Sequence, residues 1–331
     1  MFKKISVIIP VYNGEAYLER CLKSVFGQVN FDTNDLEILI LNDGSTDGSR
    51  GIIERYKAAH HDIILAVHQL NKGIAKTRNT GIDLAHGIYI MFLDQDDYFD
   101  ADYCRTFYDA IEASQADVVS GGYRRPDSRG KIHQVNLPKI GSEYAKYIMV
   151  AAWAKIHRTE FLRANKIKFF DNKFGEDHVF TIKEIVSTQH WQQINYIGYN
   201  WFLNKCSVSS ASQKGLTLED QASLLTLLAC LIKVHKNRQG QALFQYYLLR
   251  TVTYYLLFAG QQATPQNFIK SFLKLLQFLE TEYPRLYKNQ YLPFGPVGET
   301  IAARGTILGF VLLRKLRLER FFARLYCHTK A

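Results

Sequence analysis

Three aspartates stand close together in the segment YIMFLDQDDYFD, residues 89–100. They are Asp94, Asp96 and Asp97, and they follow directly on an apolar run. At an effective dielectric constant of 20 and a separation of about 5 Å, two carboxylates repel by roughly 3 kcal/mol, so a cation would stabilise the cluster. If the strand persists that far, Asp94 and Asp96 project to the same side, because side chains alternate along a strand. Two such carboxylates suit Mg²⁺ or Mn²⁺, which prefer oxygen ligands and keep positions open for substrate phosphates.

The same aspartates also have a purely structural interpretation. Acidic residues cap helices and favour the first helical turn, and the stretch YCRTFYDAIEA at 103–113 is expected to be a helix. A second Asp-x-Asp, Asp100 and Asp102, lies just downstream and shows how readily this spacing arises. The motif alone leaves the metal site and the helix cap equally open.

A second polar motif, NDGSTDGS at residues 42–49, follows another apolar run. Asp43 could accept a hydrogen bond from a ligand N–H group, and Gly44 would let that ligand approach the backbone. The same residue types also form turns and caps for local reasons. The motif lacks the Gly and Lys spacing of a phosphate-binding P-loop, and no G-x-G-x-x-G follows the first apolar run. Mononucleotide hydrolysis and dinucleotide redox chemistry are therefore disfavoured.

The first 120 residues indicate the scaffold that must position these motifs. Short β-rich runs alternate with amphipathic stretches, in the order KISVIIPVY, EAYLERCLKSVF, LEILILND, SRGIIERYKAA, IILAVHQ, IAKTRNTGIDLA, YIMFLD and YCRTFYDAIEA. This repeat predicts an α/β fold with a mostly parallel, Rossmann-like sheet and helices on both faces. Ligands bind such sheets beyond the carboxyl ends of the strands, which is where VYNG (11–14), NDGSTDGS and DQDD (94–97) stand.

The remaining sequence divides into two parts. Residues 121–214 are interpreted as the rest of the same domain, on the acceptor side of a cleft. From about Leu216 the apolar pattern is helical to the end, and the Ser-rich run SVSSASQKG before it is typical of a linker. We therefore expect an α/β domain at 1–214 and a helical region at 215–331.

The bulk composition bounds the class of protein. The chain has 331 residues, 47% hydrophobic and 22% charged, which is typical of a globular protein. Its longest apolar stretches are too short to span a bilayer or are interrupted by Arg250, and the N-terminal apolar run ends at Pro10 and Asn13, short of a signal peptide. Five scattered cysteines without a Cys-x-x-Cys pair argue against a disulfide framework and a thiolate metal site: Cys21, Cys104, Cys206, Cys230 and Cys327. We expect an intracellular protein.

The net charge of +10 is concentrated near the C-terminus, where seven Lys or Arg from Arg304 onward face Glu319 alone. Nucleic-acid binding is therefore not the expected function. On a helical wheel, the segment GTILGFVLLRKLRLERFFARLY places four arginines within an arc of about 120°, with Lys315 interrupting the opposite, apolar side. The arginines are Arg314, Arg317, Arg320 and Arg324, and the apolar side comprises Ile307, Leu308, Val311, Leu312, Leu318, Phe322, Leu325 and Tyr326. The pattern predicts a basic amphipathic helix on an anionic membrane surface; the alternative is a terminal helix packed on the domain or on another subunit.

Four blocks in fixed order carry a family resemblance: SVIIPVYNGEAYLERCLKSVFGQ, LEILILNDGSTDGS, NKGIAKTRNTGIDLAHGIYIMFLDQDD and GEDHVF. Together they resemble glycosyltransferase family 2, the inverting enzymes of the GT-A fold, over residues 4–210. Within that family the chain is most similar to bacterial capsule, lipooligosaccharide and teichoic-acid sugar transferases. The resemblance implies that residues 1–214 form the catalytic domain and that a UDP-sugar is the donor.

The resemblance also implies a donor site with a divalent cation, Mn²⁺ or Mg²⁺. The base would be bordered by Pro10, Val11 and Tyr12, and its uracil N3–H would be accepted by Asp43. Arg78 would lie near the diphosphate, and Gln95 would also belong to the donor site. Asp96 would bind the metal, and Asp94 would contact the ribose or the metal shell. The cation would offset the charge that develops on the departing nucleoside diphosphate. Arg78 could assist as a bidentate donor.

An inverting transfer also needs a base that takes the proton from the acceptor hydroxyl. In GEDHVF the family pattern indicates Asp177 as this base, with Glu176 beside it as an acceptor-binding or supporting carboxylate. Acidic residues in a helix's first turn are also favoured by the helix dipole alone. His178 would complete the metal shell or simply pack.

Two positions depart from the family pattern. In AAWAKIHR, Trp153 and Lys155 resemble a W-N-K segment, but Ala154 replaces the Asn, which puts an acceptor contact from that position in doubt. Asn42 stands where many relatives carry a first Asp. Trp201 could stack on a sugar, although an aromatic residue near a sheet edge is more often part of a core.

The sequence therefore predicts a metal-dependent inverting glycosyltransferase that acts on a cell-surface glycan or lipid-linked acceptor, in the cytoplasm and peripheral on the inner face of the membrane. Two alternatives stay open: an inactive glycan- or membrane-binding scaffold of the same fold, and a nucleotidyltransferase, which would normally show a Gly-rich basic loop after the first strand. The sequence does not identify the sugar, the acceptor linkage or the oligomeric state.

Overall fold

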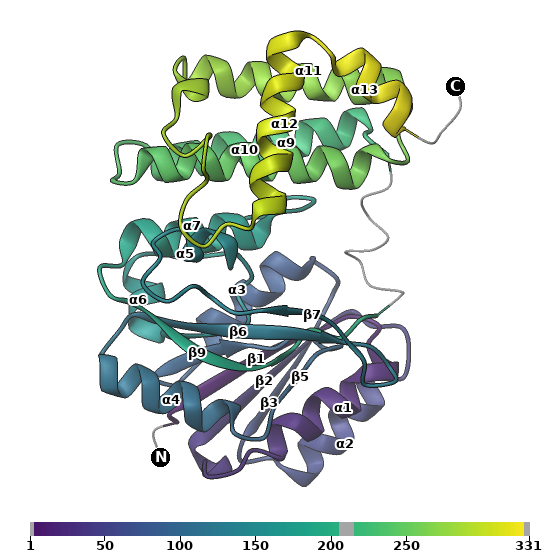
Figure 1. Cartoon of the computed structure of the whole chain (residues 1–331). Coiled ribbons are helices and arrows are strands. Elements are labelled where there is room, and N and C mark those ends of the chain that lie inside the picture. Colours follow the sequence, from purple (N-terminus) through teal and green to yellow (C-terminus); the bar gives the residue numbers. More distant parts are fainter. Residues whose placement is uncertain (1–2, 205–214, 328–331) are drawn as a thin grey trace. The chain divides into compact units, whose positions relative to one another are not determined.

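The computed structural model describes residues 3–204 and 215–327. The chain divides into two compact units (Figure 1). Unit 1 comprises Met1–Gly141, Met149–Asp171 and Glu176–Asn204, and unit 2 comprises Ser142–Ile148, Asn172–Gly175 and Lys205–Ala331. Two short segments of the predicted first domain therefore cluster with the C-terminal region. The predicted border after residue 214 falls in 205–214, outside the described residues, and stays a prediction.

Unit 1 is built on a mixed sheet with strand order β3-β2-β1-β4-β8-β6-β9-β5, and β7 pairs with β6. The strands are β1 (Ile5–Val11), β2 (Leu36–Asp43), β3 (Ile64–Gln69), β4 (Tyr89–Phe92), β5 (Tyr98–Phe99), β6 (Val118–Pro126), β7 (Ile132–Asn136), β8 (Lys155–Arg158) and β9 (Trp191–Asn200). The first four pair in parallel, as predicted, whereas β8 joins β4 and β6 antiparallel. The parallel half thus continues into a mixed half.

Helices cover both faces of this sheet, because the central strands are apolar on both sides. The helices of unit 1 are α1 (Glu15–Phe26), α2 (Ser49–Ala59), α3 (Ile74–Leu84), α4 (Tyr103–Ser114), α6 (Thr159–Ala164) and α7 (Glu176–Ser187), with a 3₁₀ turn at Thr33–Asp35. Alternate residues of β1 enter two different cores: Val7 packs in the core that includes Leu18 of α1, and Ile8 in the core that includes Ile82 of α3. The predicted helices on both faces are confirmed.

Unit 2 is helical, as predicted. Its elements are α5 (Ala145–Ile148), α9 (Leu218–His235), α10 (Gln241–Gly260), α11 (Pro265–Glu282), a 3₁₀ turn (Leu286–Lys288), α12 (Ile301–Leu316) and α13 (Glu319–Tyr326). Threonines begin three of these helices: Thr217 forms a capping box with Asp220, and Thr264 and Thr300 each accept a backbone N–H of the first turn. Among the described residues, no helix combines the length and the hydrophobicity needed to cross a membrane.

The prediction of one continuous amphipathic helix at the C-terminus is wrong. Helix α12 ends at Leu316, and Arg317 adopts a left-handed conformation with φ 59°. The N–H groups of Arg317 and Leu318 bond back to Arg314 and Leu313, which satisfies the last carbonyls of α12 and turns the chain into α13. A helical wheel assumes an unbroken helix, so its faces do not describe this segment.

Candidate active site

The end of strand β2 is tied to the start of α3 through Asp43. Its side chain is buried (4% exposed), and its carboxylate accepts hydrogen bonds from the backbone N–H groups of Lys72 (3.0 Å) and Gly73 (2.9 Å) and from Gln69 Nε2 (2.8 Å). Asp43 therefore shapes the loop that leads into α3, the helix that carries Arg78. A carboxylate offers about four acceptor positions, so one further N–H group can still be accommodated.

The end of β1 is clamped to the aspartate motif by Gln95. Its side-chain amide accepts the N–H of Tyr12 (2.8 Å) and donates to the Tyr12 carbonyl (2.9 Å). A Cβ on Gly14 would lie 2.3 Å from the Gln95 side-chain oxygen, so a larger residue there would displace the Gln95 amide from this position. The Tyr12 ring is exposed while Pro10 and Val11 are buried. Of the three residues predicted to border the base, only Tyr12 presents its side chain to solvent.

The three aspartates of DQDD have different surroundings. Asp97 is buried, where its carboxylate accepts hydrogen bonds from Tyr199 Oη (2.6 Å) and the Phe202 N–H (2.8 Å), so it fixes the loop. Burial, together with Asp96 and Asp94, raises the pKa of Asp97. Asp94 and Asp96 are only partly buried. These two are the carboxylates left for a ligand.

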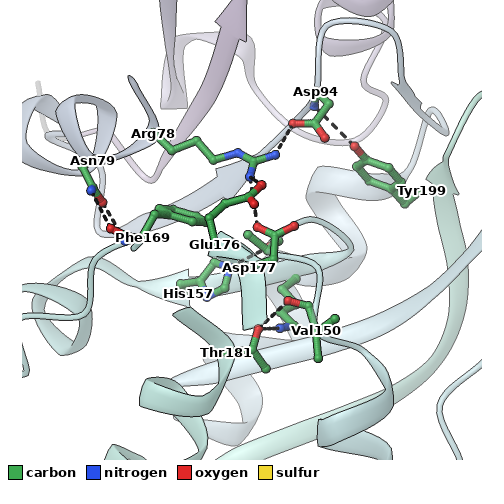
Figure 2. Close-up of polar contacts among 12 residues, drawn as sticks. Arg78, Asn79, Asp94, Val150, His157, Phe169, Glu176, Asp177, Thr181 and Tyr199 are labelled. Atoms are coloured by element: carbon green, nitrogen blue, oxygen red, sulfur yellow. Dashed lines mark hydrogen bonds and ion pairs between the residues drawn. The ribbon is translucent and has the colours of Figure 1, made fainter. Parts of the chain in front are cut away.

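Arg78 is the centre of the polar cluster (Figure 2). The residue is 3% exposed, and its guanidinium donates to Asp94 Oδ1 (2.7 Å), Asp177 Oδ1 (3.0 Å) and Glu176 Oε1 (3.3 Å). Burial alone would lower the pKa of Arg78, but the three carboxylates more than offset it, and the net shift is upward. One cation therefore joins the aspartate motif to the start of α7, although the sequence separates them by about eighty residues.

The start of α7 holds the two carboxylates predicted to act on the acceptor. Both lie in the first helical turn, where the helix dipole favours negative charge. Burial raises the pKa of Asp177 to about 7, and Glu176 and Asp94 act in the same direction while Arg78 and Lys155 oppose it. Near neutral pH this carboxyl group can both accept and release a proton. A pKa in this range is compatible with the predicted role of Asp177 as a general base.

A model of the family described as "Glycosyl transferase family 2" matches residues 6–174. The chain belongs to glycosyl transferase family 2. The predicted family is thereby confirmed.

Relatives of this family 2 chain include bacterial glycosyltransferases. The chain is 32% identical over 225 residues to "Glycosyltransferase GlyA" of Streptococcus pneumoniae, covering 62% of this chain and 31% of that protein. It is 32% identical over 184 residues to a poly(ribitol-phosphate) beta-glucosyltransferase of Bacillus spizizenii, covering 54% of this chain and 29% of that protein. The chain thus spans about a third of the length of these curated relatives.

The fold is also that of solved transferases. Staphylococcus aureus TarS 1–349 in complex with UDP-GlcNAc superposes with a TM-score of 0.60 at 19% identity, covering 87% of this chain and 93% of that chain. A mannosyltransferase of Pyrobaculum calidifontis, solved with GDP-Man and Mn²⁺, superposes with a TM-score of 0.53 at 16% identity, covering 98% of this chain and 84% of that chain. The predicted GT-A fold is confirmed.

In this family 2 chain, the oxygen atoms of Asp94 and Asp96 fit a divalent cation that also binds substrate phosphates. Burial and the charge of Asp94 raise the pKa of Asp96, which is the response of a carboxylate that lacks enough positive charge nearby. Within the described residues, no three His, Cys, Asp or Glu side chains are arranged to hold a metal ion by themselves. Mg²⁺ and similar ions commonly use one or two carboxylates and complete their shell with water and substrate phosphates, so this arrangement is compatible with them. His178 is half-buried in α7, and its metal role stays a prediction.

Several residues of the site escaped the sequence analysis. Tyr199 accepts the Asp94 N–H (3.3 Å), Asn204 donates to Asp96 Oδ2 (3.1 Å), and Arg20 donates to the Asp96 carbonyl (2.6 Å). No local sequence pattern identifies these three residues, since they lie 105, 108 and 76 residues from their partners in the aspartate motif.

Position 154, flagged as a departure from W-N-K, has a backbone conformation that does not favour the residue present. Ala154 is buried and adopts φ 55°, in the left-handed region that Asn tolerates better than Ala. Lys155 is also fully buried, and it donates to Thr181 (2.9 Å) and lies 3.5 Å from Glu184, both on α7. The segment therefore supports the helix that carries Asp177. Trp201 is half-buried and packs against Tyr123 and Trp153 (ring centroids 5.8 and 5.7 Å), which favours the core interpretation.

Proposed function

We propose that the protein is a metal-dependent, inverting glycosyltransferase that moves a sugar from a UDP-sugar to a hydroxyl group of a growing cell-surface glycan or lipid-linked acceptor. The observation that carries the proposal is the Arg78 cluster. One guanidinium bonds Asp94, on the side predicted to bind the donor phosphates, and Asp177, the predicted acceptor base. The carboxylate predicted to serve the sugar donor and the one predicted to serve the acceptor hydroxyl are thus both hydrogen-bonded to the guanidinium of Arg78.

The donor end of the site supports a uridine nucleotide. Asp43 retains acceptor capacity at the end of β2, and the exposed Tyr12 ring at the end of β1 offers a surface for a base. The TarS structures are described as complexes with UDP and with UDP-GlcNAc. These observations are compatible with the proposed UDP-sugar donor.

The diphosphate would bind beside Arg78, Asp94 and Asp96. When bound there, Mn²⁺ or Mg²⁺ supplies Lewis-acid stabilisation of the departing nucleoside diphosphate. Arg78 is charged and oriented by its three carboxylates, and its buried Nε, which has no partner among the described residues, would donate to a phosphate oxygen. Asp96 and Asp94 provide the negative charge that recruits the cation.

Asp177 would take the proton from the acceptor hydroxyl as that oxygen attacks the sugar from the face opposite the leaving group. Its pKa near 7 leaves it largely ionised at mildly alkaline pH and basic enough to accept a proton. Glu176, beside it, would orient the acceptor through its own hydrogen bonds. The result is transfer with inversion at the sugar carbon.

Two observations support the acceptor class and the location. Relatives from Bacillus spizizenii and Staphylococcus aureus are named for poly(ribitol-phosphate), and the segment from Arg304 onward carries seven Lys or Arg against one Glu. We therefore propose a cytoplasmic enzyme that works at the inner face of the membrane.

The test is a donor panel. The full chain is incubated with nucleotide sugars and candidate acceptors, and release of nucleoside diphosphate is measured with Mn²⁺, with Mg²⁺ and with EDTA. We expect UDP release that depends on the metal and is abolished by Asp96→Asn. The exposed Asp62→Asn is the matched control and should have no effect. Metal-independent release would refute the metal role, and pyrophosphate release from a triphosphate would show a nucleotidyltransferase instead.

A further inference from the structure

Helix α13 exposes two neighbouring rows of side chains to solvent, one apolar and one basic. Phe321 and Leu325 are 64% and 68% exposed, and the exposed Arg320 and Arg324 run beside them. At about 100° per residue, each pair is separated by roughly 40° and the two rows by roughly 100°. The remaining residues of the helix, including the buried Ala323, face the core of unit 2. Exposed apolar side chains that lie beside one another can mark an interaction surface.

The turn before α13 continues this face. Lys315, Leu316, Arg317 and Leu318 are all exposed, with Leu316 at 63% and Leu318 at 43%. The left-handed Arg317 ends α12 here, so these four side chains stand at the corner between two helices. We call the eight residues the basic-apolar face: Lys315, Leu316, Arg317, Leu318, Arg320, Phe321, Arg324 and Leu325.

The cations of this face are not neutralised within the described part of the chain. No salt bridge there involves any of its four basic residues, whereas the neighbouring Arg314 pairs with Glu280 of α11 through two bonds of 2.8 Å. Glu319, the one acidic residue of α12 and α13, is buried. The face therefore carries four exposed positive charges.

We propose that the basic-apolar face docks the protein on an anionic lipid membrane, with Phe321 and Leu325 inserted among the lipids and the flanking arginines on the phosphates. This inference deepens the proposed function, on which it rests, by naming the surface that brings that enzyme to its membrane. Aromatic and aliphatic side chains beside Lys and Arg are the composition of helices that lie in a membrane interface. Long basic side chains can keep their charge at the phosphates while their stems contact the apolar region.

A second copy of the chain is a poorer occupant than a membrane. In a two-fold dimer the same patch meets itself, so four cations would face four cations. The charge of an anionic bilayer is complementary instead, and it attracts basic residues near its surface.

The structure changes which residues carry this role. The helical wheel assigned the apolar side to residues that include Ile307 and Val311, but these are buried in unit 2, and Arg314 is held by Glu280. An apolar groove of about 450 Å³ opens beside these helices and is lined by Leu257, Gly305, Gly309, Phe310, Leu313 and Phe322. None of the eight residues of the basic-apolar face lines this groove.

The test is cosedimentation of the full chain with vesicles of phosphatidylcholine alone or with added phosphatidylglycerol. We expect binding to the anionic vesicles only. Arg320→Gln with Arg324→Gln should weaken that binding by about 30-fold at low salt, since each basic residue near the surface contributes a factor of roughly five. Phe321→Ser with Leu325→Ser should weaken it by at least about tenfold.

The matched control is Lys270→Gln with Lys274→Gln. These lysines are exposed on α11 at the same i, i+4 spacing, and no large apolar side chain on α11 is exposed beside them. The control changes the net charge equally and should retain nearly full binding.

Three results would overturn the proposal: equal binding to neutral vesicles, an equal loss in the control pair, or a chain that dimerises in solution through a contact that Phe321→Ser with Leu325→Ser abolishes. The vesicle assay contains no sugar donor, so a lack of vesicle binding would count against the docking surface and not against the proposed transferase activity. The face variants should keep wild-type nucleoside diphosphate release with a soluble acceptor. A chain that binds vesicles but releases no diphosphate from any donor would refute the enzyme and leave the docking surface standing.

Discussion

The Arg78 cluster and the basic-apolar face use charge in opposite ways. In the cluster, one guanidinium, 3% exposed, bonds three carboxylates at 2.7–3.3 Å. On the face, four basic residues are exposed and make no salt bridge within the described residues. Buried charges interact strongly because little water screens them, whereas exposed charges act weakly and additively over a surface. The first arrangement suits a single defined ligand, and the second suits an extended anionic surface.

The largest effect is expected from Asp177→Asn, which keeps the shape of the cluster and removes its proton acceptor. Sugar transfer should fall by about 10²–10⁴-fold, the usual contribution of a general base. UDP binding, measured by calorimetry, should change little. Asp83→Asn, which alters an exposed carboxylate on α3, is the control. Near-full transfer by Asp177→Asn would show that another group is the base.

Arg78→Lys should have a smaller effect, of about 10- to 100-fold on kcat/KM for the donor. Lysine keeps the charge but loses the planar fork, and a hydrogen bond to a charged group contributes about 1.5–3 kcal/mol. Steady-state kinetics with varied donor measures the loss. If a point charge were sufficient at this position, the variant would match the wild type.

The pH dependence tests the cluster without a mutation. The pKa of Asp177 is raised to about 7, so its ionised, proton-accepting form is lost as the pH falls through that value. The kcat/KM for transfer should therefore drop about tenfold for each pH unit below 7 and level off above it. Because the folded pKa of Asp177 is raised, this residue destabilises the folded protein increasingly as the pH rises from about 4, the unfolded pKa, to about 7. The melting temperature of Asp177→Asn minus that of the wild type should therefore be larger at pH 8 than at pH 4. A flat rate profile between pH 5 and pH 8 would contradict the assignment.

The smallest effect is expected from salt on turnover, and this should distinguish the Arg78 cluster from the basic-apolar face. Raising the salt concentration from about 0.1 M to about 1 M shortens the Debye length from about 10 Å to about 3 Å. Vesicle binding through the exposed face should then be largely lost, whereas turnover with a soluble acceptor should change by less than about threefold, because Arg78 and its partners are shielded from the ions. Equal sensitivity of both activities would remove the distinction between the regions.

Local pattern was sufficient for the parallel half of the sheet in unit 1. The apolar runs predicted β1 to β4 as neighbouring parallel strands, and the rule that ligands bind at the carboxyl ends of such strands brought Tyr12, Asp43 and Asp94 to one edge. The start of α7 could be assigned only through the family blocks, since acidic residues begin many helices for reasons of the dipole alone. The contact of Arg78 with both ends of the site had no sequence signal, because its partners lie 16 and 99 residues away.

The sequence by itself determined the family, the alternating α/β scaffold and the residue types of the site, because apolar periodicity and ordered motifs are properties of local sequence. Only the tertiary structure decided which charges meet. It turned Asp97 inward to hold the loop, left Asp94 and Asp96 partly exposed, and placed Arg78 against Asp177. It also ended α12 at Arg317, so that residues assigned to a membrane face became core and others became exposed. Burial and pairing depend on residues distant in sequence, and these set both the pKa of a carboxylate and the face that a helix presents.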